Sequence, residues 1–128
     1  MSYRFLILED SITDRAQIKR AVRLSGLSAG VIQEASDVIE AIDLLAGNTA
    51  DLVLASLDLP VASAAEMVGR LITEPSTRSV PVIIMSEDPK PLEIRRLLRR
   101  GARGYLRKPF TPDALREVAS PILEPTHV

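Results

Sequence analysis

Five side chains with carboxylate, hydroxyl or ammonium groups come directly after short apolar runs, and together they could do chemistry: Glu9, Asp10, Ser56, Ser86 and Lys108. Two adjacent acids repel one another unless a cation or a basic side chain compensates them, and carboxylate oxygens are ligands that Mg²⁺ prefers. A hydroxyl can bind an anion, and a lysine ammonium can bind an anion or a carboxylate. The simpler alternatives are that Asp10 or Ser11 caps a helix, that Ser86 caps a turn and that Lys108 is solvated.

The segments that precede these residues predict where they meet. Apolar runs at 5–8, 52–55, 80–85 and 104–106 are typical of buried strands, and the segment 31–35 predicts a weaker strand. These five segments alternate with segments of helical periodicity. This alternation predicts an α/β fold of five β-α units, with a doubly wound parallel sheet covered by helices on both faces. In such folds the site lies beyond the carboxyl ends of the strands, so we expect the polar residues to meet there.

The sequence also predicts how three of the helices begin, pack or end. Ser63 is placed to cap the helix that follows the third strand. Leu97 and Leu98 are expected to be buried on the helix 91–100. Pro121 lacks a backbone N–H and should kink or fray the last turn of the final helix.

The composition is that of one ordinary soluble domain. The chain has 128 residues, of which 46% are hydrophobic and 26% charged, and its formal net charge of −1 argues against a general polyanion binder. It has no cysteine, which excludes disulfides and thiolate chemistry, and no apolar run approaches a signal-peptide core or a membrane span. We expect a cytoplasmic protein with one domain at 1–124 and a short tail at 125–128. Whether it is a complete protein or part of a longer one stays open.

Four segments in order resemble the receiver domain of the response-regulator family, of the chemotaxis type. They are Phe-Leu-Ile-Leu-Glu-Asp-Ser (5–11), Asp-Leu-Val-Leu-Ala-Ser-Leu-Asp-Leu-Pro (51–60), Pro-Val-Ile-Ile-Met-Ser (81–86) and Gly-Tyr-Leu-Arg-Lys-Pro-Phe (104–110). The resemblance covers about residues 4–123 and implies the flavodoxin-like (βα)5 receiver fold. It also implies a role in bacterial two-component signalling.

The resemblance gives each polar residue an expected role. Glu9 and Asp10 match the acidic pair that helps to bind Mg²⁺ in the family. Ser86 and Lys108 match the hydroxyl and the lysine that engage the phosphoryl oxygens. Tyr105 matches the aromatic residue that changes rotamer when a receiver is activated.

The phosphate-accepting position departs from the family pattern. The family places its acceptor aspartate four residues before the proline of the next loop, and counting back from Pro60 gives Ser56. Asp58 lies where the family uses a backbone carbonyl for the metal, and Ser63-Ala64 stands where it often has Asp-Gly. A neutral serine hydroxyl needs a base to become a nucleophile, and the one histidine, His127, is in the tail.

Loss of this carboxylate also weakens the expected metal site. Two unit charges ~4 Å apart are worth roughly 4 kcal/mol at an effective dielectric of 20, so the deficit against a divalent cation is on the order of several kcal/mol before screening. We therefore expect Mg²⁺ to bind weakly or not at all at Glu9 and Asp10, and no cofactor to be required. Lys108, without its usual anion, should pair with Glu9 or Asp10.

Two functions of different classes follow. The first is a degenerate, pseudo-receiver that is not an enzyme and acts as a phosphorylation-independent interaction module. The alternative is a phosphotransfer receiver with Mg²⁺ and an unorthodox acceptor, either Ser56 or Asp58; Asp58 is disfavoured because two extended residues would move it about 6–7 Å away. A serine introduced experimentally is a third explanation, and the missing Asp-Gly favours natural divergence over it.

A run of basic residues marks the expected partner surface. Between Glu93 and Asp113 there is no acid and there are seven basic residues: Arg95, Arg96, Arg99, Arg100, Arg103, Arg107 and Lys108. The resemblance implies that the fourth helix, fifth strand and fifth helix form an output or dimer surface. Arginine suits carboxylates, so we expect an acidic signalling protein to dock there, with a homodimer as another partner class and a solvated helix face as the plain alternative. Aromatic residues are only 3% of the chain, which argues against nucleic acid.

Overall fold

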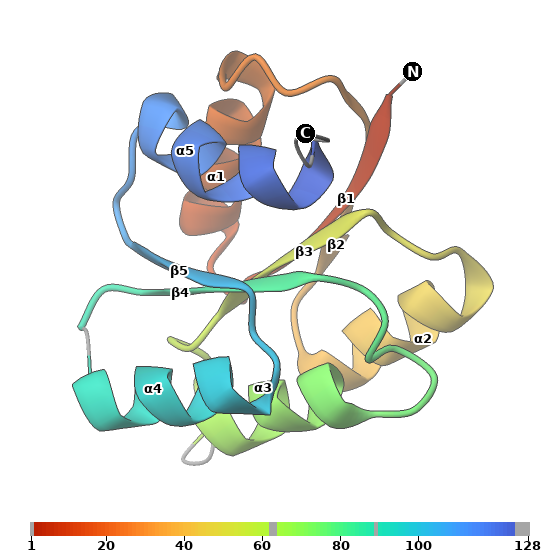
Figure 1. Cartoon of the computed structure of the whole chain (residues 1–128), viewed down its shortest axis with the longest axis vertical. Helices are drawn as coiled ribbons and strands as arrows, with labels where there is room; N and C mark the ends of the chain where they lie inside the picture. Colours follow the sequence, from red (N-terminus) through yellow and green to blue (C-terminus); the bar gives the residue numbers. More distant parts are fainter. Residues whose placement is uncertain (1, 62–63, 89, 125–128) are drawn as a thin grey trace.

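A computed structural model describes residues 2–61, 64–88 and 90–124 of the chain, and in it strands and helices alternate (Figure 1). The elements are β1 (Tyr3–Leu8), α1 (Ile12–Leu24), β2 (Ala29–Ala35), α2 (Val38–Gly47), β3 (Leu52–Ser56), α3 (Ala64–Thr73), β4 (Val82–Ser86), α4 (Pro91–Arg100), β5 (Gly104–Arg107) and α5 (Pro112–Leu123). The predicted α/β fold with five β-α units is confirmed.

The five strands form one parallel sheet in the order β2-β1-β3-β4-β5. Helices α1 and α5 cover one face of the sheet, and α2, α3 and α4 cover the other (Figure 1). Because every strand runs in the same direction, all five carboxyl ends lie along one edge of the sheet. The register pairs Ser56 with Met85 and Ser86 with Arg107, which aligns the ends of β3, β4 and β5 at that edge.

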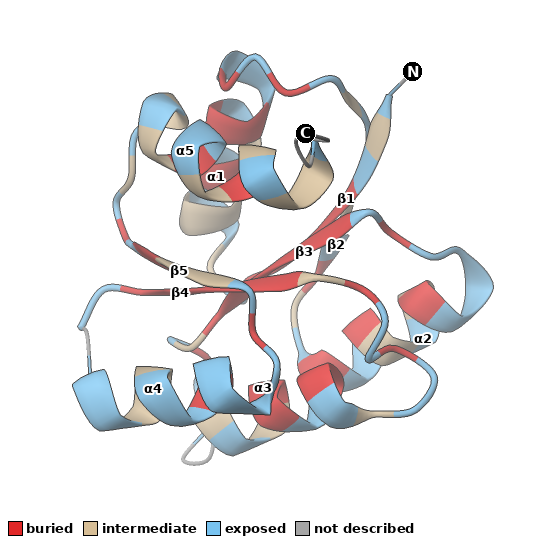
Figure 2. Ribbon diagram, in the orientation of Figure 1, coloured by how far each residue is buried: buried red, intermediate tan, exposed pale blue. Residues whose placement is uncertain are grey.

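Two apolar layers hold the helices to the sheet. Every residue of β3 and β4 is buried, as expected for central strands that are covered on both faces (Figure 2). Along β1 the side chains alternate: Leu6 and Leu8 join the layer under α2, α3 and α4, whereas Phe5 and Ile7 join the layer under α1 and α5. The strand ends are therefore anchored from both sides, and the polar residues that follow them have fixed positions.

Side-chain caps begin several of the helices. Ser11, one of the two predicted caps of α1, accepts a hydrogen bond at Oγ from Asp14 N at 3.2 Å, and Thr111 Oγ1 accepts one from Ala114 N at 3.0 Å. Ser63, the predicted cap of α3, lies outside the described residues. Gly101, with a φ of +127°, ends α4 where the sequence predicts.

One detail of the predicted helices is wrong, and another is only partly tested. Leu98 is 41% exposed, whereas Leu97 is only 2% exposed, because one step along a helix turns the side chain by about 100° and α4 buries a single narrow stripe. Helix α5 continues through Pro121 to Leu123, so the last turn is not frayed at the proline, and the alternative of a kink there stays a prediction. Pro121 is exposed, and its ring lies at the surface of the last turn. No helix in the described part of the chain has the length and apolar character needed to span a membrane.

Candidate functional site

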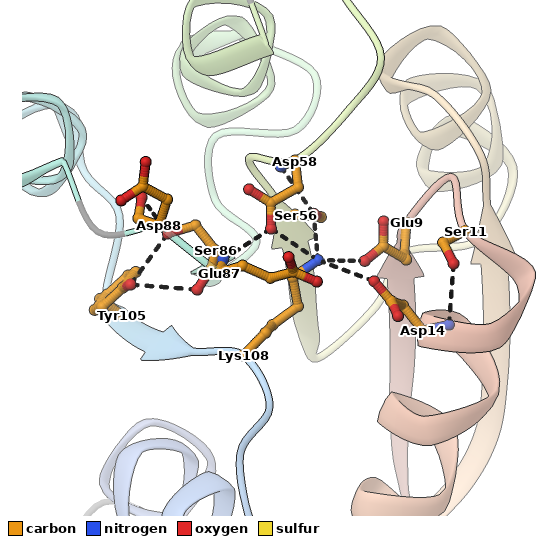
Figure 3. A network of polar contacts seen from close by, with 10 residues as sticks. All are labelled: Glu9, Ser11, Asp14, Ser56, Asp58, Ser86, Glu87, Asp88, Tyr105 and Lys108. Carbon is orange, nitrogen blue, oxygen red and sulfur yellow. Dashed lines mark hydrogen bonds and ion pairs between the residues drawn. The ribbon is translucent and has the colours of Figure 1, made fainter.

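The Lys108 ammonium is the centre of a polar cleft at the carboxyl ends of β1, β3 and β5 (Figure 3). Its Nζ donates to Glu9 Oε1 at 2.5 Å and to Ser56 Oγ at 3.0 Å. The Glu9, Ser56 and Lys108 residues are 1%, 0% and 7% exposed. These are charged and polar groups inside the fold, so their mutual contacts replace the water that each has lost.

Asp58 brings a second carboxylate into the cleft from the loop after β3. Its Oδ2 lies 3.0 Å from Lys108 Nζ and accepts a hydrogen bond from the Glu87 main-chain N–H at 2.8 Å. The Asp58 N–H donates to Ser56 Oγ at 3.0 Å, which closes a local serine turn. The prediction that Asp58 lies about two extended residues away from the site is therefore wrong, because the chain folds back at Ser56 instead of continuing straight.

The two acids that follow β1 have different surroundings. Glu9 is buried and pairs with Lys108, as predicted, but Asp10 is exposed and makes no polar side-chain contact with the cleft in the described part of the chain. Because only Glu9 lies inside the cleft and contacts Lys108, Glu9 and Asp10 do not form a joint site in this structure. Asp14, from the first turn of α1, instead places Oδ2 3.6 Å from Lys108 Nζ. The sequence gives one indication of this contact: Asp14 comes three residues after the cap Ser11, in the first helical turn beyond β1.

The charges around Lys108 stabilise its protonated form. Burial alone disfavours the ammonium, but hydrogen bonds and attraction from Glu9 and Asp58 outweigh this effect and raise the pKa of Lys108 above its ordinary value. Lys108 is therefore a positive charge at every physiological pH. It cannot act as a base in this cleft.

Ser86 and Tyr105 form a second polar contact beside the cleft (Figure 3). The Tyr105 hydroxyl lies 3.0 Å from Ser86 Oγ and 3.4 Å from the Ser86 carbonyl oxygen, to which it can donate. Ser86 Oγ also donates to the Asp88 carbonyl oxygen at 3.3 Å. The Ser86 hydroxyl is thus directed toward β5 and the start of the loop before α4.

The residues around Lys108 do not fit a Mg²⁺ site. No group of three acidic, histidine or cysteine side chains in the described ranges is arranged to hold a metal. The ammonium of Lys108 stands between the Glu9 and Asp58 carboxylates, where it supplies the positive charge that these acids need. Arg15 Nη1 also donates to the Glu9 carbonyl oxygen at 3.0 Å, so that oxygen already has a partner.

The arginine face is defined by the six exposed arginines of α4, β5 and the turn between them: Arg95, Arg96, Arg99, Arg100, Arg103 and Arg107. None of them forms an ion pair with an acid in the described part of the chain. Arg100 differs from the others because its guanidinium rests on Gly69 of α3, where a Cβ would overlap Nη1. Arg96 and Arg100 also line a hollow of about 300 Å³ with Glu66 and Glu93.

Known proteins resemble this chain in sequence and in fold. The chemotaxis protein CheY homolog of Campylobacter jejuni is 29% identical over 121 residues, which cover 94% of this chain and 92% of the relative. The gliding motility regulatory protein of Myxococcus xanthus is 35% identical over 105 residues, which cover 82% of this chain but 13% of that relative. The solved structure of Vibrio cholerae chemotaxis protein CheY4 superposes with a TM-score of 0.80 at 22% identity, over 96% of this chain and 100% of that one.

The family assignment rests on a match to the response regulator receiver domain over residues 5–120. That range includes every strand end of the cleft and all six residues of the arginine face. It agrees with the fold, which is similar to that of a solved chemotaxis protein. The chain therefore belongs to the response regulator receiver domain family.

Proposed function

We propose that this receiver domain is a phosphorylation-independent protein-interaction module of a two-component pathway in the cytoplasm, and that it has no enzymatic activity of its own. The observation that carries the proposal is the closed set of contacts around Lys108. Ser56, at the position of the family's acceptor, is buried and bonded to this lysine, and the lysine is also paired with Glu9 and Asp58.

The surroundings of Ser56 disfavour a nucleophilic serine. Both polar contacts of its Oγ in the described part of the chain come from donors, the Lys108 ammonium and the Asp58 N–H. A serine nucleophile needs an adjacent base to take its proton, and a protonated lysine cannot do so. The serine oxygen is a structural acceptor that helps to satisfy a buried charge.

The second candidate function is phosphotransfer to Asp58, and one observation favours it. The Asp58 carboxylate is ionisable, lies beside Lys108 and is 33% exposed, so a phosphodonor could reach it. In that reaction a carboxylate oxygen would attack phosphorus, and the donor's leaving group would depart with its bonding electrons. We rank this below the interaction module because Oδ2 is already held by two donors and because the cleft does not fit a divalent cation.

The partner proposed for the arginine face is an acidic surface of a signalling protein. Arginine guanidinium groups bind carboxylates in bidentate fashion, and exposed charges without an internal partner can do so at little cost in rearrangement. Arg95, Arg99, Arg103 and Arg107 are the most available members, since Arg100 rests on α3. A second copy of the chain is a less favoured partner, because the same basic patch would face itself in a two-fold dimer.

A capture experiment tests the proposal. The purified domain is immobilised, and partner binding from a lysate of its own cells is compared with and without acetyl phosphate and Mg²⁺. We expect the same partner in the same amount under both conditions. Capture that requires the phosphodonor would support the phosphotransfer alternative and reject the interaction module.

A further inference from the structure

We infer that the Asp58 carboxylate is a built-in anion that fills the anion-binding end of the cleft and holds the start of the β4–α4 loop in one arrangement. The inference rests on the proposed function in one respect, the independence from phosphorylation. A domain that carries its own anion in the cleft has no need of an added phosphoryl group. Its evidence is the geometry of the donors around Asp58, which is independent of any partner.

Two donors from different strand ends converge on one oxygen of Asp58. Lys108 Nζ, beyond β5, lies 3.0 Å from Oδ2, and the Glu87 N–H, beyond β4, donates to the same atom at 2.8 Å. Hydrogen bonds to an ionised acceptor are roughly twice as strong as neutral ones. An external oxyanion would need these same two donors, so it would have to displace the Asp58 carboxylate to bind.

Serine at position 56 makes room for this arrangement. The Ser56 hydroxyl accepts the Asp58 N–H at 3.0 Å and so turns the Asp58 side chain back toward Lys108. A carboxylate at position 56 would put another negative charge among Glu9, Asp14 and Asp58, all of which lie within 3.6 Å of the Lys108 ammonium. Repulsion between like charges would then push Asp58 out of the cleft. The neutral serine and the anionic Asp58 therefore work as a pair.

The contacts continue from Asp58 toward α4. Asp58 fixes the main chain at Glu87, which directly follows Ser86, and Ser86 Oγ lies 3.0 Å from the Tyr105 hydroxyl. Tyr105 packs against the same apolar layer as Leu97 of α4. The anion in the cleft is thus connected through a continuous set of contacts to the helix that carries part of the arginine face.

Hydrogen exchange of the Glu87 amide, followed by NMR, measures this contact directly. Wild type is compared with Asp58→Asn, which removes the charge but keeps the shape, and with Asp58→Ala. Asp88→Asn is the matched control, since it removes a carboxylate from the same loop that makes no side-chain hydrogen bond in the described part of the chain. Each protein is measured with and without inorganic phosphate, and no phosphodonor or partner is present.

We expect the Glu87 amide to exchange about tenfold faster in Asp58→Ala than in wild type, as for loss of a charge-assisted hydrogen bond, with Asp58→Asn in between and Asp88→Asn unchanged. Phosphate should slow the exchange in Asp58→Ala and leave wild type unaffected. Unchanged exchange in both Asp58 variants would overturn the inference. So would a phosphate response equal in wild type and Asp58→Ala, or no phosphate response in Asp58→Ala. None of these results depends on whether the domain accepts a phosphoryl group or captures a partner, so the two proposals can fail separately.

Discussion

The polar cleft and the arginine face differ in where their charges find partners. In the cleft, one ammonium is surrounded by the carboxylates of Glu9, Asp14 and Asp58 within 3.6 Å, and the pair Lys108–Glu9 is almost completely buried. On the arginine face, exposed guanidinium groups have no acidic partner in the described part of the chain. The two regions are connected through Ser86 and Tyr105, yet the charges of the cleft are paired with one another and those of the arginine face are exposed to solvent.

This difference indicates a structural role for the charges of the cleft and is consistent with the binding role that we propose for the arginine face. Exposed charges contribute little to stability, so the exposed arginines are not expected to hold the fold together. Buried charges destabilise a fold strongly when one partner is lost. Substitutions in the cleft should therefore affect folding first, whereas substitutions on the arginine face should affect binding first.

The largest expected effect is that of Lys108→Met. Removing the ammonium leaves the Glu9 carboxylate buried without its partner, which should lower the free energy of unfolding by about 3–5 kcal/mol. Urea denaturation of wild type and variant measures the difference. Lys90→Met, at an exposed lysine without an ion pair in the described ranges, should change the free energy of unfolding by less than about 0.5 kcal/mol. Equal stabilities of the two variants would show that the cleft is not a structural unit.

The next effect is a loss of binding. The double substitution Arg95→Glu and Arg99→Glu should weaken partner capture by about tenfold or more, because it replaces attraction with repulsion toward an acidic surface. Arg20→Glu with Arg23→Glu makes the same change of charge on exposed positions of α1. If both double variants bind the partner as wild type does, the arginine face is only a solvated helix surface.

The charged state of Lys108 predicts a pH dependence of stability. Its pKa in the folded domain is higher than its ordinary value of about 10.5. The contribution of the Lys108 charge to the free energy of unfolding is therefore complete below about pH 10.5, and it is lost as the pH rises from there through the folded-state pKa. Each pH unit between the unfolded-state and folded-state pKa values of Lys108 corresponds to about 1.4 kcal/mol. Subtracting the unfolding free energies of Lys108→Met from those of wild type at each pH removes the titration of the tyrosines. A difference that stays constant through this alkaline range would contradict the assigned ion pairs.

The smallest expected effects are those of two glycine-to-alanine substitutions beside the arginine face, one next to a flexible side chain and one next to a tightly packed side chain. In Gly69→Ala the new methyl group meets the end of the Arg100 side chain, which can swing into solvent, and alanine favours the helix; the net change should stay within about 1 kcal/mol. In Gly104→Ala the new Cβ would lie 2.6 Å from Val118 Cγ1, whose position is set by the packing of α5 on β5. This variant should lose roughly 1–3 kcal/mol. Thermal unfolding compares the two, and an equal loss would mean that Arg100 is held as firmly as Val118.

The sequence was sufficient to predict the fold and the location of the cleft. Continuous apolar runs such as 52–55 that alternate with helical segments are typical of central strands of a parallel sheet, and this places Glu9, Ser56, Ser86 and Lys108 at one edge of the sheet. Their approach to one another follows from strand direction alone. The pattern of apolar residues is therefore enough to predict at which edge of the sheet the site lies.

The contacts within the cleft were harder to predict, because they depend on local turns and on rotation about single helices. Asp58 enters the cleft through a serine turn that has no periodic signal, and Asp14 reaches it from the first turn of α1. The apolar character of Leu98 predicts a place in the core, but α4 buries Leu97 and leaves Leu98 exposed. Such details require the relative placement of elements, which periodicity alone does not give.

The intact mass of the domain, after incubation with acetyl phosphate and Mg²⁺, tests the central claim most directly. Because Ser56 lacks a base and Lys108 is already paired with Glu9 and Asp58, we predict that the mass stays that of the unmodified chain. A stoichiometric phosphate on the protein would contradict this account. Loss of that adduct in Asp58→Ala would then identify Asp58 as the acceptor, and its loss in Ser56→Ala would identify the serine.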